Sequence, residues 1–189
     1  MTGTPVGAVL AGGRGRRLGG DKAIVELDGI PLVRYPINAL RSAGLDVAVV
    51  AKAGTALPDL PPGTAVWVEA ASGHHPVNGL VHALHCAHGR SILAVACDLA
   101  LLDGLTVRAL LGAGNAAPQA AAVVPRTAGR LHPLCALYRP SALRRLAAAD
   151  PDGRMTEIVL TLEPAILELD DETPLLPVNA PEDVLRASA

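Results

Sequence analysis

Two patterns of apolar residues alternate along the chain. Uninterrupted apolar runs, as in residues 46–51 (DVAVVA) and 91–97 (SILAVAC), are typical of strands that are buried on both faces. Between such runs, apolar residues recur at helical spacing, as in the segment that opens at Pro31 and closes at Gly44. Strands that alternate with helices predict right-handed crossovers between parallel strands. We therefore expect a three-layer α/β/α fold around a Rossmann-like, mainly parallel sheet.

The same patterns predict the remaining elements. Strands are expected at residues 6–10, 23–27, 46–51, 65–68, 91–97, 120–125, 132–138 and 165–169. Further helices are expected at residues 78–88, 105–111, 140–149, 156–162 and 181–187, with Asn78 as the N-cap of the first of these. Nothing in the composition marks a boundary, so residues 1–189 are expected to form a single domain.

Composition and charge exclude several classes of protein. Half of the 189 residues are hydrophobic and 18% are charged, which is typical of a globular chain. The net charge of -2 argues against nonspecific binding of nucleic acid, which normally requires an excess of basic residues. The first apolar run is too short for a signal peptide, and no run approaches the roughly 18 residues of a membrane span. We therefore expect a cytoplasmic protein that does not bind membranes.

The richest chemistry lies in residues 6–22, VGAVLAGGRGRRLGGDK, where a predicted strand opens into a glycine-rich loop with basic residues. Glycines let backbone N–H groups approach a ligand closely, and the basic side chains attract anions, so the loop is suited to hold phosphate. The chain has fourteen arginines but only two lysines, Lys22 and Lys52. A lysine that persists in the loop therefore has a role that arginine does not fill.

Two familiar phosphate loops do not fit this segment. Residues 15–20 have the spacing of a Walker A motif, but Asp21 follows where that motif requires lysine. The glycines are also spaced one residue too widely for the dinucleotide fingerprint. The next predicted strand moreover leads into Lys52 and brings no acid for a ribose, which argues against a Rossmann dehydrogenase.

Asp98 is the second candidate for chemistry. It interrupts the apolar run ILAVACDLALL at the predicted carboxyl end of a central strand, where an unpaired charge is costly. Ligands of open α/β sheets bind at these strand ends, so Asp98 is expected to face the same crevice as the glycine loop. A carboxylate opposite a phosphate loop is suited to Mg²⁺, and the alternative is a cap for the following helix.

Together, the segments LAGGRGRRLGGDK and ACDLALL resemble the molybdenum cofactor guanylyltransferase family, whose pattern is LAGGxSxRMGxDK. Further segments resemble the family motifs GPLxG, CDxP, HPLxAxY and VNTPED in the same order, at residues 75–79, 97–98, 132–138 and 178–183. The resemblance covers nearly the whole chain and implies a sheet of the nucleotidyltransferase type. It implies an enzyme that transfers GMP from GTP to molybdopterin, releases pyrophosphate and uses Mg²⁺. Molybdoenzymes or their maturation factors are implied as further partners.

The resemblance also implies roles for individual residues. The purine and ribose of GTP would contact Leu10, Ala11, Gly12 and Gly13. The phosphates would bind Arg17 and Lys22, and Mg²⁺ would bind Asp98. Asn179 resembles a polar ligand on the other side of the crevice, and Glu69 stands near a family aspartate at the base. These residues suit the chemistry, because nucleotidyl transfer depends mainly on positioning and charge neutralisation, and a phosphate monoester is already an ionised nucleophile.

Two alternatives remain open. One is transfer of another nucleotide or to another acceptor, such as CMP to molybdopterin or a nucleotide to a sugar phosphate. The second glycine of Leu10-Ala-Gly-Gly favours the guanylyl branch by resemblance. The other is a catalytically degenerate nucleotide-binding regulatory protein. It is motivated by two departures from the family motifs: His75 stands in place of a glycine, and Leu99-Ala100 follows Asp98, so the family proline is missing there.

Two further clusters are expected to be structural. His82 and Cys86 share a helix face at i,i+4, but His85 and His88 lie on other faces and no HExxH motif is present, which argues against zinc. The acidic run at residues 170–172 is interpreted as a solvated turn.

Overall fold

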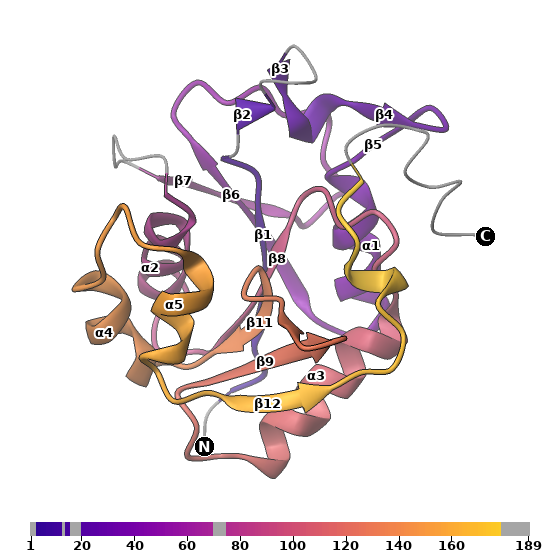
Figure 1. The fold of residues 1–189 in the computed structure, drawn as a ribbon. Coiled ribbons are helices and arrows are strands. Elements are labelled where there is room, and N and C mark those ends of the chain that lie inside the picture. The colour runs from indigo at the N-terminus through magenta and orange to yellow at the C-terminus, as the bar shows by residue number, and fades with distance from the viewer. Residues whose placement is uncertain (1–2, 13, 16–19, 70–74, 179–189) are drawn as a thin grey trace.

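The protein has a central sheet between two layers of helices (Figure 1). The computed structural model describes residues 3–12, 14–15, 20–69 and 75–178. The main sheet has the strand order β10-β9-β11-β8-β1-β6-β7, and β12 pairs with β9. Its strands are β1 (Val6–Leu10), β6 (Asp46–Lys52), β7 (Ala65–Glu69), β8 (Ile92–Ala96), β9 (Ala122–Thr127), β10 (Arg130–Leu131), β11 (Cys135–Tyr138) and β12 (Ala165–Glu168).

The sheet is mixed but mostly parallel, as the sequence predicts. β1 lies between β6 and β8 and is parallel to both, and β7 continues the parallel set beside β6. β11 is antiparallel to β8 and to β9, and β10 is antiparallel to β9, so two strands on that side run against the parallel set. Because β1, β6, β7 and β8 run the same way, their carboxyl ends meet at one edge of the sheet.

Two sets of helices cover the two faces. One face carries α1 (Arg34–Ser42) and α3 (Gly104–Ala116). The other carries α2 (Pro76–Cys86), α4 (Leu143–Ala147) and α5 (Met155–Leu160). Side chains alternate along each strand, so Val9 packs under the first set and Ala8 under the second. A doubly covered sheet explains why its strands are continuous apolar runs.

One close contact fixes how near α1 can approach the sheet. A Cβ added to Gly7 would lie 2.9 Å from Cδ1 of Leu40, which is fully buried on α1. The absence of a side chain at position 7 therefore lets α1 pack directly on β1. A strand glycine at this position serves packing, not a turn.

The region after the glycine loop differs from the predicted strand at 23–27. It begins with a 3₁₀ turn, η1 (Lys22–Ile24), and only β4 (Glu26–Leu27) is extended. β4 pairs with β5 (Ile30–Pro31) across a tight turn in which Asp28 and Gly29 have positive φ. Pro31 belongs to this hairpin, so the following helix starts at residue 34. The sequence predicts a start at Pro31, which is wrong.

Other predicted boundaries were too wide. The strand expected at 132–138 begins at Cys135, because residues 132–134 form a turn that the Cys135 N–H closes onto the His132 carbonyl. The helix expected at 140–149 is a 3₁₀ turn, η2 (Pro140–Ala142), followed by α4. A further 3₁₀ turn is η3 (Thr173–Leu175), and a small hairpin joins β2 (Arg14–Gly15) to β3 (Gly20–Asp21). The helix expected at 181–187 lies outside the described residues.

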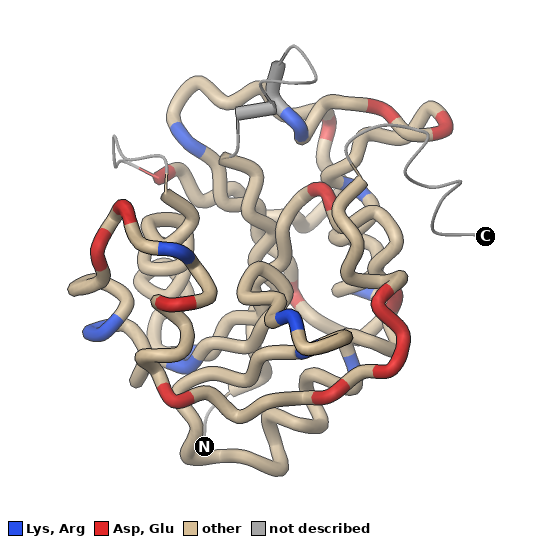
Figure 2. Tube along the Cα trace, in the orientation of Figure 1, with Lys and Arg blue, Asp and Glu red and all other residues tan. Residues whose placement is uncertain are grey.

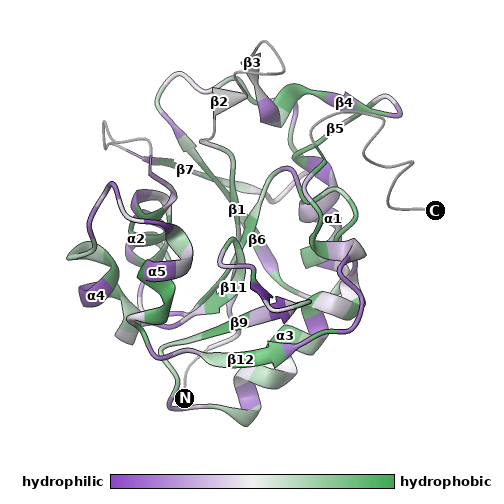
Figure 3. Cartoon of the chain, in the orientation of Figure 1, coloured by the Kyte–Doolittle hydropathy of each residue, from purple (hydrophilic) through white to green (hydrophobic). Residues whose placement is uncertain are grey.

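Charge and hydropathy follow the layers. Lysine, arginine, aspartate and glutamate lie mostly in loops and at the ends of elements (Figure 2). The central strands and the inner faces of the helices are apolar (Figure 3). Among the helices of the described residues, none has the length and apolar character needed to cross a membrane.

Candidate active site

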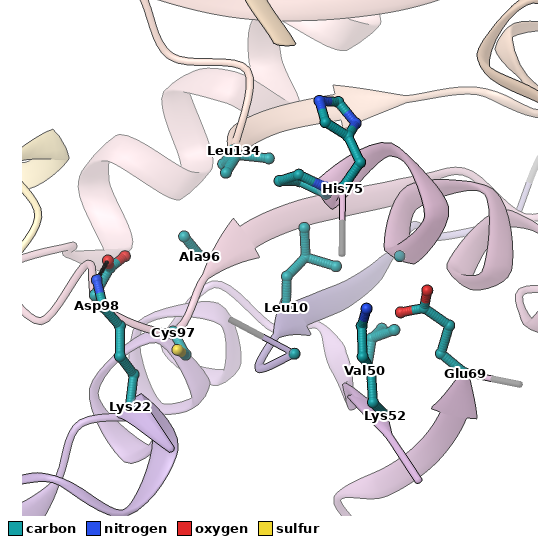
Figure 4. Close-up of a pocket in the computed structure, with 13 residues that line it drawn as sticks. Leu10, Lys22, Val50, Lys52, Glu69, His75, Ala96, Cys97, Asp98 and Leu134 are labelled. Carbon is teal, nitrogen blue, oxygen red and sulfur yellow. Dashed lines mark hydrogen bonds and ion pairs between the residues drawn. The ribbon is translucent and has the colours of Figure 1, made fainter. Parts of the chain in front are cut away.

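A cavity of about 240 Å³ lies at the carboxyl edge of the sheet. It is bounded by the ends of the four parallel strands, the start of α2 and the segment before β11 (Figure 4). Its lining places Lys22 and Asp98 at one end, Lys52 and Glu69 at the other, and Leu10 between them. The cavity therefore has two charged ends separated by an apolar floor.

At the first end, Lys22 and Asp98 form an ion pair. The Lys22 Nζ donates to Asp98 Oδ2 at 2.6 Å, and the two side chains are 22% and 15% exposed. Asp98 stands in the turn that follows β8, whereas Lys22 begins η1 after the glycine loop. Asp98 therefore faces the same crevice as the described part of that loop, as the sequence predicts.

Backbone contacts hold both partners of this pair in place. Next to Lys22, Ala23 is fully buried, and its carbonyl accepts a hydrogen bond from the N–H of Val33. The Asp98 carbonyl accepts from the Val178 N–H at 2.8 Å, which ties the end of the described chain to the turn. Because the backbone beside both residues is already fixed, less conformational entropy is lost when their side chains bind a ligand.

The alternative in which Asp98 caps the following helix is wrong. The N-cap of α3 is Asp103, whose Oδ1 accepts from the Thr106 N–H at 2.7 Å. Four residues lie between the two aspartates, because the chain makes a turn at residues 100–101 before α3 begins. Asp98 thus keeps its carboxylate in the cavity.

Cys97, beside the aspartate, also lines the cavity but is chemically quiet. Burial, and secondarily the Asp98 carboxylate, raise the pKa of its thiol to about 12. The thiol is therefore protonated at neutral pH and does not act as a nucleophile.

At the second end, Glu69 is a buried carboxylate. The residue is 5% exposed, and its Oε1 has no hydrogen-bond partner among the described residues. Burial raises the pKa of Glu69, and the charges of Lys52 and His82 oppose this rise. A buried carboxylate oxygen without a partner is costly, so this end of the cavity is suited to a ligand that donates hydrogen bonds.

Two glycines let the backbone close around this end. A Cβ on Gly79 of α2 would lie 3.4 Å from Cδ2 of Leu10 and 3.8 Å from Oε2 of Glu69. A Cβ on Gly12 would lie 3.4 Å from Cγ of Lys52. Without these side chains, the start of α2 and the glycine loop both approach the cavity closely.

A third wall is formed by His75, Pro76 and Leu134. His75, and not Asn78, is the N-cap of α2: its Nδ1 accepts from the Val77 N–H at 3.3 Å. The prediction of an Asn78 cap is wrong because Pro76 takes the first helical position, which proline favours, and so starts the helix two residues earlier.

The HPLCALY segment at residues 132–138 supports this wall. The buried Tyr138 hydroxyl donates to the Pro133 carbonyl at 2.7 Å, and the Leu134 carbonyl accepts from the Ala96 N–H at 2.8 Å. These bonds fix the turn that presents Leu134 to the cavity.

The predicted site residues thus fall into three groups. The cavity lining includes Leu10, Gly12, Lys22, Glu69 and Asp98. Ala11 is fully buried in the core, and its N–H donates to the Val50 carbonyl, so it anchors the loop beneath the cavity. The predictions at Gly13, Arg17 and Asn179 lie outside the described residues.

The other two clusters do not line the cavity. The imidazole Nε2 of His82 lies 3.5 Å from the Cys86 Sγ, and no group of three metal-ligating side chains occurs in the part of the chain that the structure describes. The acidic run at 170–172 is exposed, and Asp171 accepts from the Thr173 N–H, as expected for a solvated turn.

Sequence reasoning missed Lys52 as a residue of this site. The sequence shows Lys52 as one of two lysines and as the residue after a strand that lacks an acid for a ribose, and neither observation was used to place it in the site. The available signal was its rarity, because it is one of two lysines and stands at the carboxyl end of a predicted central strand.

Comparison with known proteins shows which family the chain resembles. The sequence profile of the MobA-like NTP transferase domain matches residues 7–165. A molybdenum cofactor guanylyltransferase from Cereibacter sphaeroides is 33% identical over 195 residues, covering 97% of this chain and 95% of that protein. The molybdenum cofactor biosynthesis bifunctional protein of Synechocystis is 29% identical over 187 residues, and the match spans 95% of this chain but only 53% of that protein.

Solved structures share the fold. Molybdopterin-guanine dinucleotide biosynthesis protein A from Archaeoglobus fulgidus superposes with a TM-score of 0.69 at 23% identity, covering 96% of this chain and 95% of that one. The 2-C-methyl-D-erythritol 4-phosphate cytidylyltransferase of Thermus thermophilus gives 0.66 at 18% identity, with 97% of each chain covered. The profile match over most of the chain and the similarity to the Cereibacter protein establish the family: this chain belongs to the MobA-like NTP transferases and is a nucleotidyltransferase.

Proposed function

We propose that the protein transfers GMP from GTP to the phosphate of molybdopterin and releases pyrophosphate. The observation that carries the proposal is the two-ended cavity, with the Lys22–Asp98 pair at one end and, at the other, the Glu69 carboxylate, whose Oε1 has no hydrogen-bond partner among the described residues. A nucleotide has the same division into a charged phosphate chain and a base that donates hydrogen bonds. The name of the Cereibacter relative supports guanylyl transfer, and the names of both relatives connect the reaction with the molybdenum cofactor.

Asp98 fits a divalent cation. Its carboxylate is partly exposed to the cavity, and Mg²⁺ is commonly held by one or two carboxylates together with substrate phosphates and water. The proposal therefore names Asp98 as the protein ligand of Mg²⁺. When bound, the ion supplies charge neutralisation at the reacting phosphates.

The residues of the chain position the substrates. Lys22 exchanges its contact with Asp98 for the phosphates of GTP, and the lack of a side chain at Gly12 lets the nucleoside approach the backbone of the loop beside Lys52. Leu10 provides an apolar contact for the nucleoside, and Glu69 accepts hydrogen bonds from the base. Roles for Gly13 and Arg17 in nucleotide binding and for Asn179 across the crevice belong to the same proposal.

The transfer needs no general base from the protein. An ionised oxygen of the acceptor phosphate forms a bond to the α-phosphorus of GTP, and the bond from that phosphorus to the bridging oxygen breaks as pyrophosphate leaves. Lys22 stabilises the charge that builds on the leaving group. A cytoplasmic location, and delivery of the product to molybdoenzymes or their maturation factors, are also part of the proposal.

Calorimetry and a pyrophosphate-release assay test the proposal. We expect Mg²⁺-dependent binding of GTP that is strongly weakened in Lys22→Ala, and pyrophosphate release only when molybdopterin is present. Tight binding of ATP but not GTP would refute the guanine assignment. Asp98→Asn is expected to fold but to lose turnover. Nucleotide binding without turnover on any acceptor would instead favour a regulatory protein.

A further inference from the structure

Lys52 and Glu69 stand side by side at the inner end of the cavity. Both residues end their strands, β6 and β7, and they are direct partners in the parallel register of these strands. Partners in register point to the same face of a sheet, and both side chains line the cavity (Figure 4). The end of the cavity thus presents an ammonium group next to a carboxylate.

The stem of Lys52 is held against the glycine loop. Its Cγ and Cε would lie 3.4 Å and 3.5 Å from a Cβ on Gly12, so the aliphatic chain runs along the backbone of that residue. The packed stem directs the ammonium group toward the cavity, and the charge of Lys52 acts on the Glu69 carboxylate. The position of the cation is therefore fixed from two sides, by the loop and by the neighbouring strand.

The Glu69 carboxylate supplies the second, independent observation. It is 5% exposed, and its Oε1 has no hydrogen-bond partner among the described residues. The charged groups that face it are Lys52 on β6 and His82 on α2. The Glu69 carboxylate can accept hydrogen bonds, and the Lys52 ammonium beside it can donate them. A complementary ligand edge therefore has hydrogen-bond donors next to an acceptor.

The Watson–Crick edge of guanine has this arrangement. Its N1–H and 2-amino groups are donors, and its O6 carbonyl is an adjacent acceptor. We propose that Lys52 determines base specificity: its ammonium donates to O6 of guanine while Glu69 accepts from N1–H and the 2-amino group. This inference rests on the proposed function and extends it to Lys52, a residue that lies outside the sequence motifs.

Adenine fails at both contacts. Its 6-amino group would bring a donor to the Lys52 ammonium, and its N1 would bring a lone pair to the Glu69 carboxylate. Sites that are built to hydrogen-bond a substrate reject analogues that leave buried polar groups unpaired more strongly than apolar pockets do. Lys52 and Glu69 together therefore accept guanine and reject adenine.

Nucleotide analogues separate the two residues. 6-Thio-GTP keeps N1–H and the 2-amino group but replaces O6 with sulfur, a weaker acceptor, whereas ITP keeps O6 and lacks the 2-amino group. We would measure the affinities of the Mg²⁺ complexes of GTP, 6-thio-GTP and ITP by calorimetry, for the wild type, Lys52→Met and Glu69→Gln. Lys22→Met serves as the matched control, because it removes a lysine from the opposite end of the cavity.

The expected affinities are compared across the three nucleotides and across the variants. The wild type binds GTP about tenfold more tightly than 6-thio-GTP, as a charge-assisted hydrogen bond predicts. Lys52→Met reduces this ratio to within about twofold and keeps the preference for GTP over ITP. Glu69→Gln loses mainly the preference over ITP, and Lys22→Met weakens the binding of all three nucleotides by a similar factor.

Each contrary result has a distinct meaning. Equal affinities of the wild type for GTP and 6-thio-GTP, or a tenfold ratio that persists in Lys52→Met, overturn the role of Lys52 and leave the proposed function standing. Absence of GTP binding by the wild type overturns both. Equal wild-type affinities for the two nucleotides refute the role of Lys52 even if Lys52→Met does not fold, which thermal unfolding would reveal.

Discussion

Removal of Lys22 should make the nucleotide-free protein bind divalent cations more tightly. In the structure, Lys22 Nζ occupies the space next to Asp98 Oδ2 at 2.6 Å, where a cation held by that oxygen would have to come. A metal ion must therefore displace the ammonium group or bind in its repulsive field. Lys22→Met keeps much of the apolar stem and removes the charge, so the Asp98 carboxylate becomes available.

The size of the effect follows from the geometry. At an effective dielectric constant of about 20, Coulomb's law gives roughly 6 kcal/mol for unit charges at this distance, and loss of hydration offsets most of it. A hydrogen bond between charged groups contributes about 1.5 to 3 kcal/mol net. Because both side chains are less than a quarter exposed, solvent screening removes only part of this. We expect a gain in Mn²⁺ affinity of about 10- to 100-fold.

Mn²⁺ binding can be followed by electron paramagnetic resonance, without any nucleotide. Lys52→Met is the matched control, since it removes the lysine that lies at the far end of the cavity, and it should gain less than about threefold. Adding Asp98→Asn to Lys22→Met should abolish the gain. Equal Mn²⁺ affinities of the wild type and Lys22→Met would refute the reasoning. Affinity for GTP with Mg²⁺ should fall in Lys22→Met, because the phosphates lose their own partner.

Three further outcomes are expected. Glu69→Gln should raise the free energy of unfolding by about 1 kcal/mol at neutral pH, since it removes a buried charge. Burial raises the pKa of Glu69 in the folded state, so the wild type is less stable than this variant above that pKa. The difference in stability should vanish as the pH falls toward the ordinary carboxyl pKa. Urea unfolding at several pH values measures this difference, and a difference that grows in acid would contradict the argument. His75→Gly should lower stability by a few tenths of a kcal/mol and His75→Asn should not, because asparagine can also accept from the Val77 N–H, so an equal loss in both variants would show that the cap is unimportant. Tyr138→Phe leaves the Pro133 carbonyl without its donor and should cost about 1 to 2 kcal/mol in thermal unfolding, whereas an unchanged melting temperature would mean that this bond contributes nothing.

The central strands and the main helices could be predicted from the sequence, because a sheet that is covered on both faces requires continuous apolar runs. β1, β6 and β8 were located in this way to within one residue. The start of α1 was missed, because the pairing of β4 with β5 depends on a turn at Asp28 and not on periodicity. The antiparallel direction of β11 is likewise set by its neighbours in space, which a single sequence does not reveal.

Site residues could be predicted where a residue differs in charge or type from the sequence around it. Asp98 in an apolar run and a lysine in an arginine-rich chain are such contradictions, and the structure brings both into one cavity. The partnership of Lys52 and Glu69 was not predictable, because it depends on the register of β6 against β7. The cap at His75 was missed for a local reason, since proline at the next position shifts the start of α2.

The bond from Val178 to the Asp98 carbonyl has a consequence for how the enzyme is made in the cell. Asp98 and Val178 lie 80 positions apart in the sequence, so synthesis must pass residue 178 before the turn at Asp98 has all its supports. Domains form as the chain leaves the ribosome, from the N-terminus onward. A nascent chain therefore completes the supports of the turn at Asp98 only after residue 178 has emerged, so a product truncated before Val178 should hold this turn less firmly.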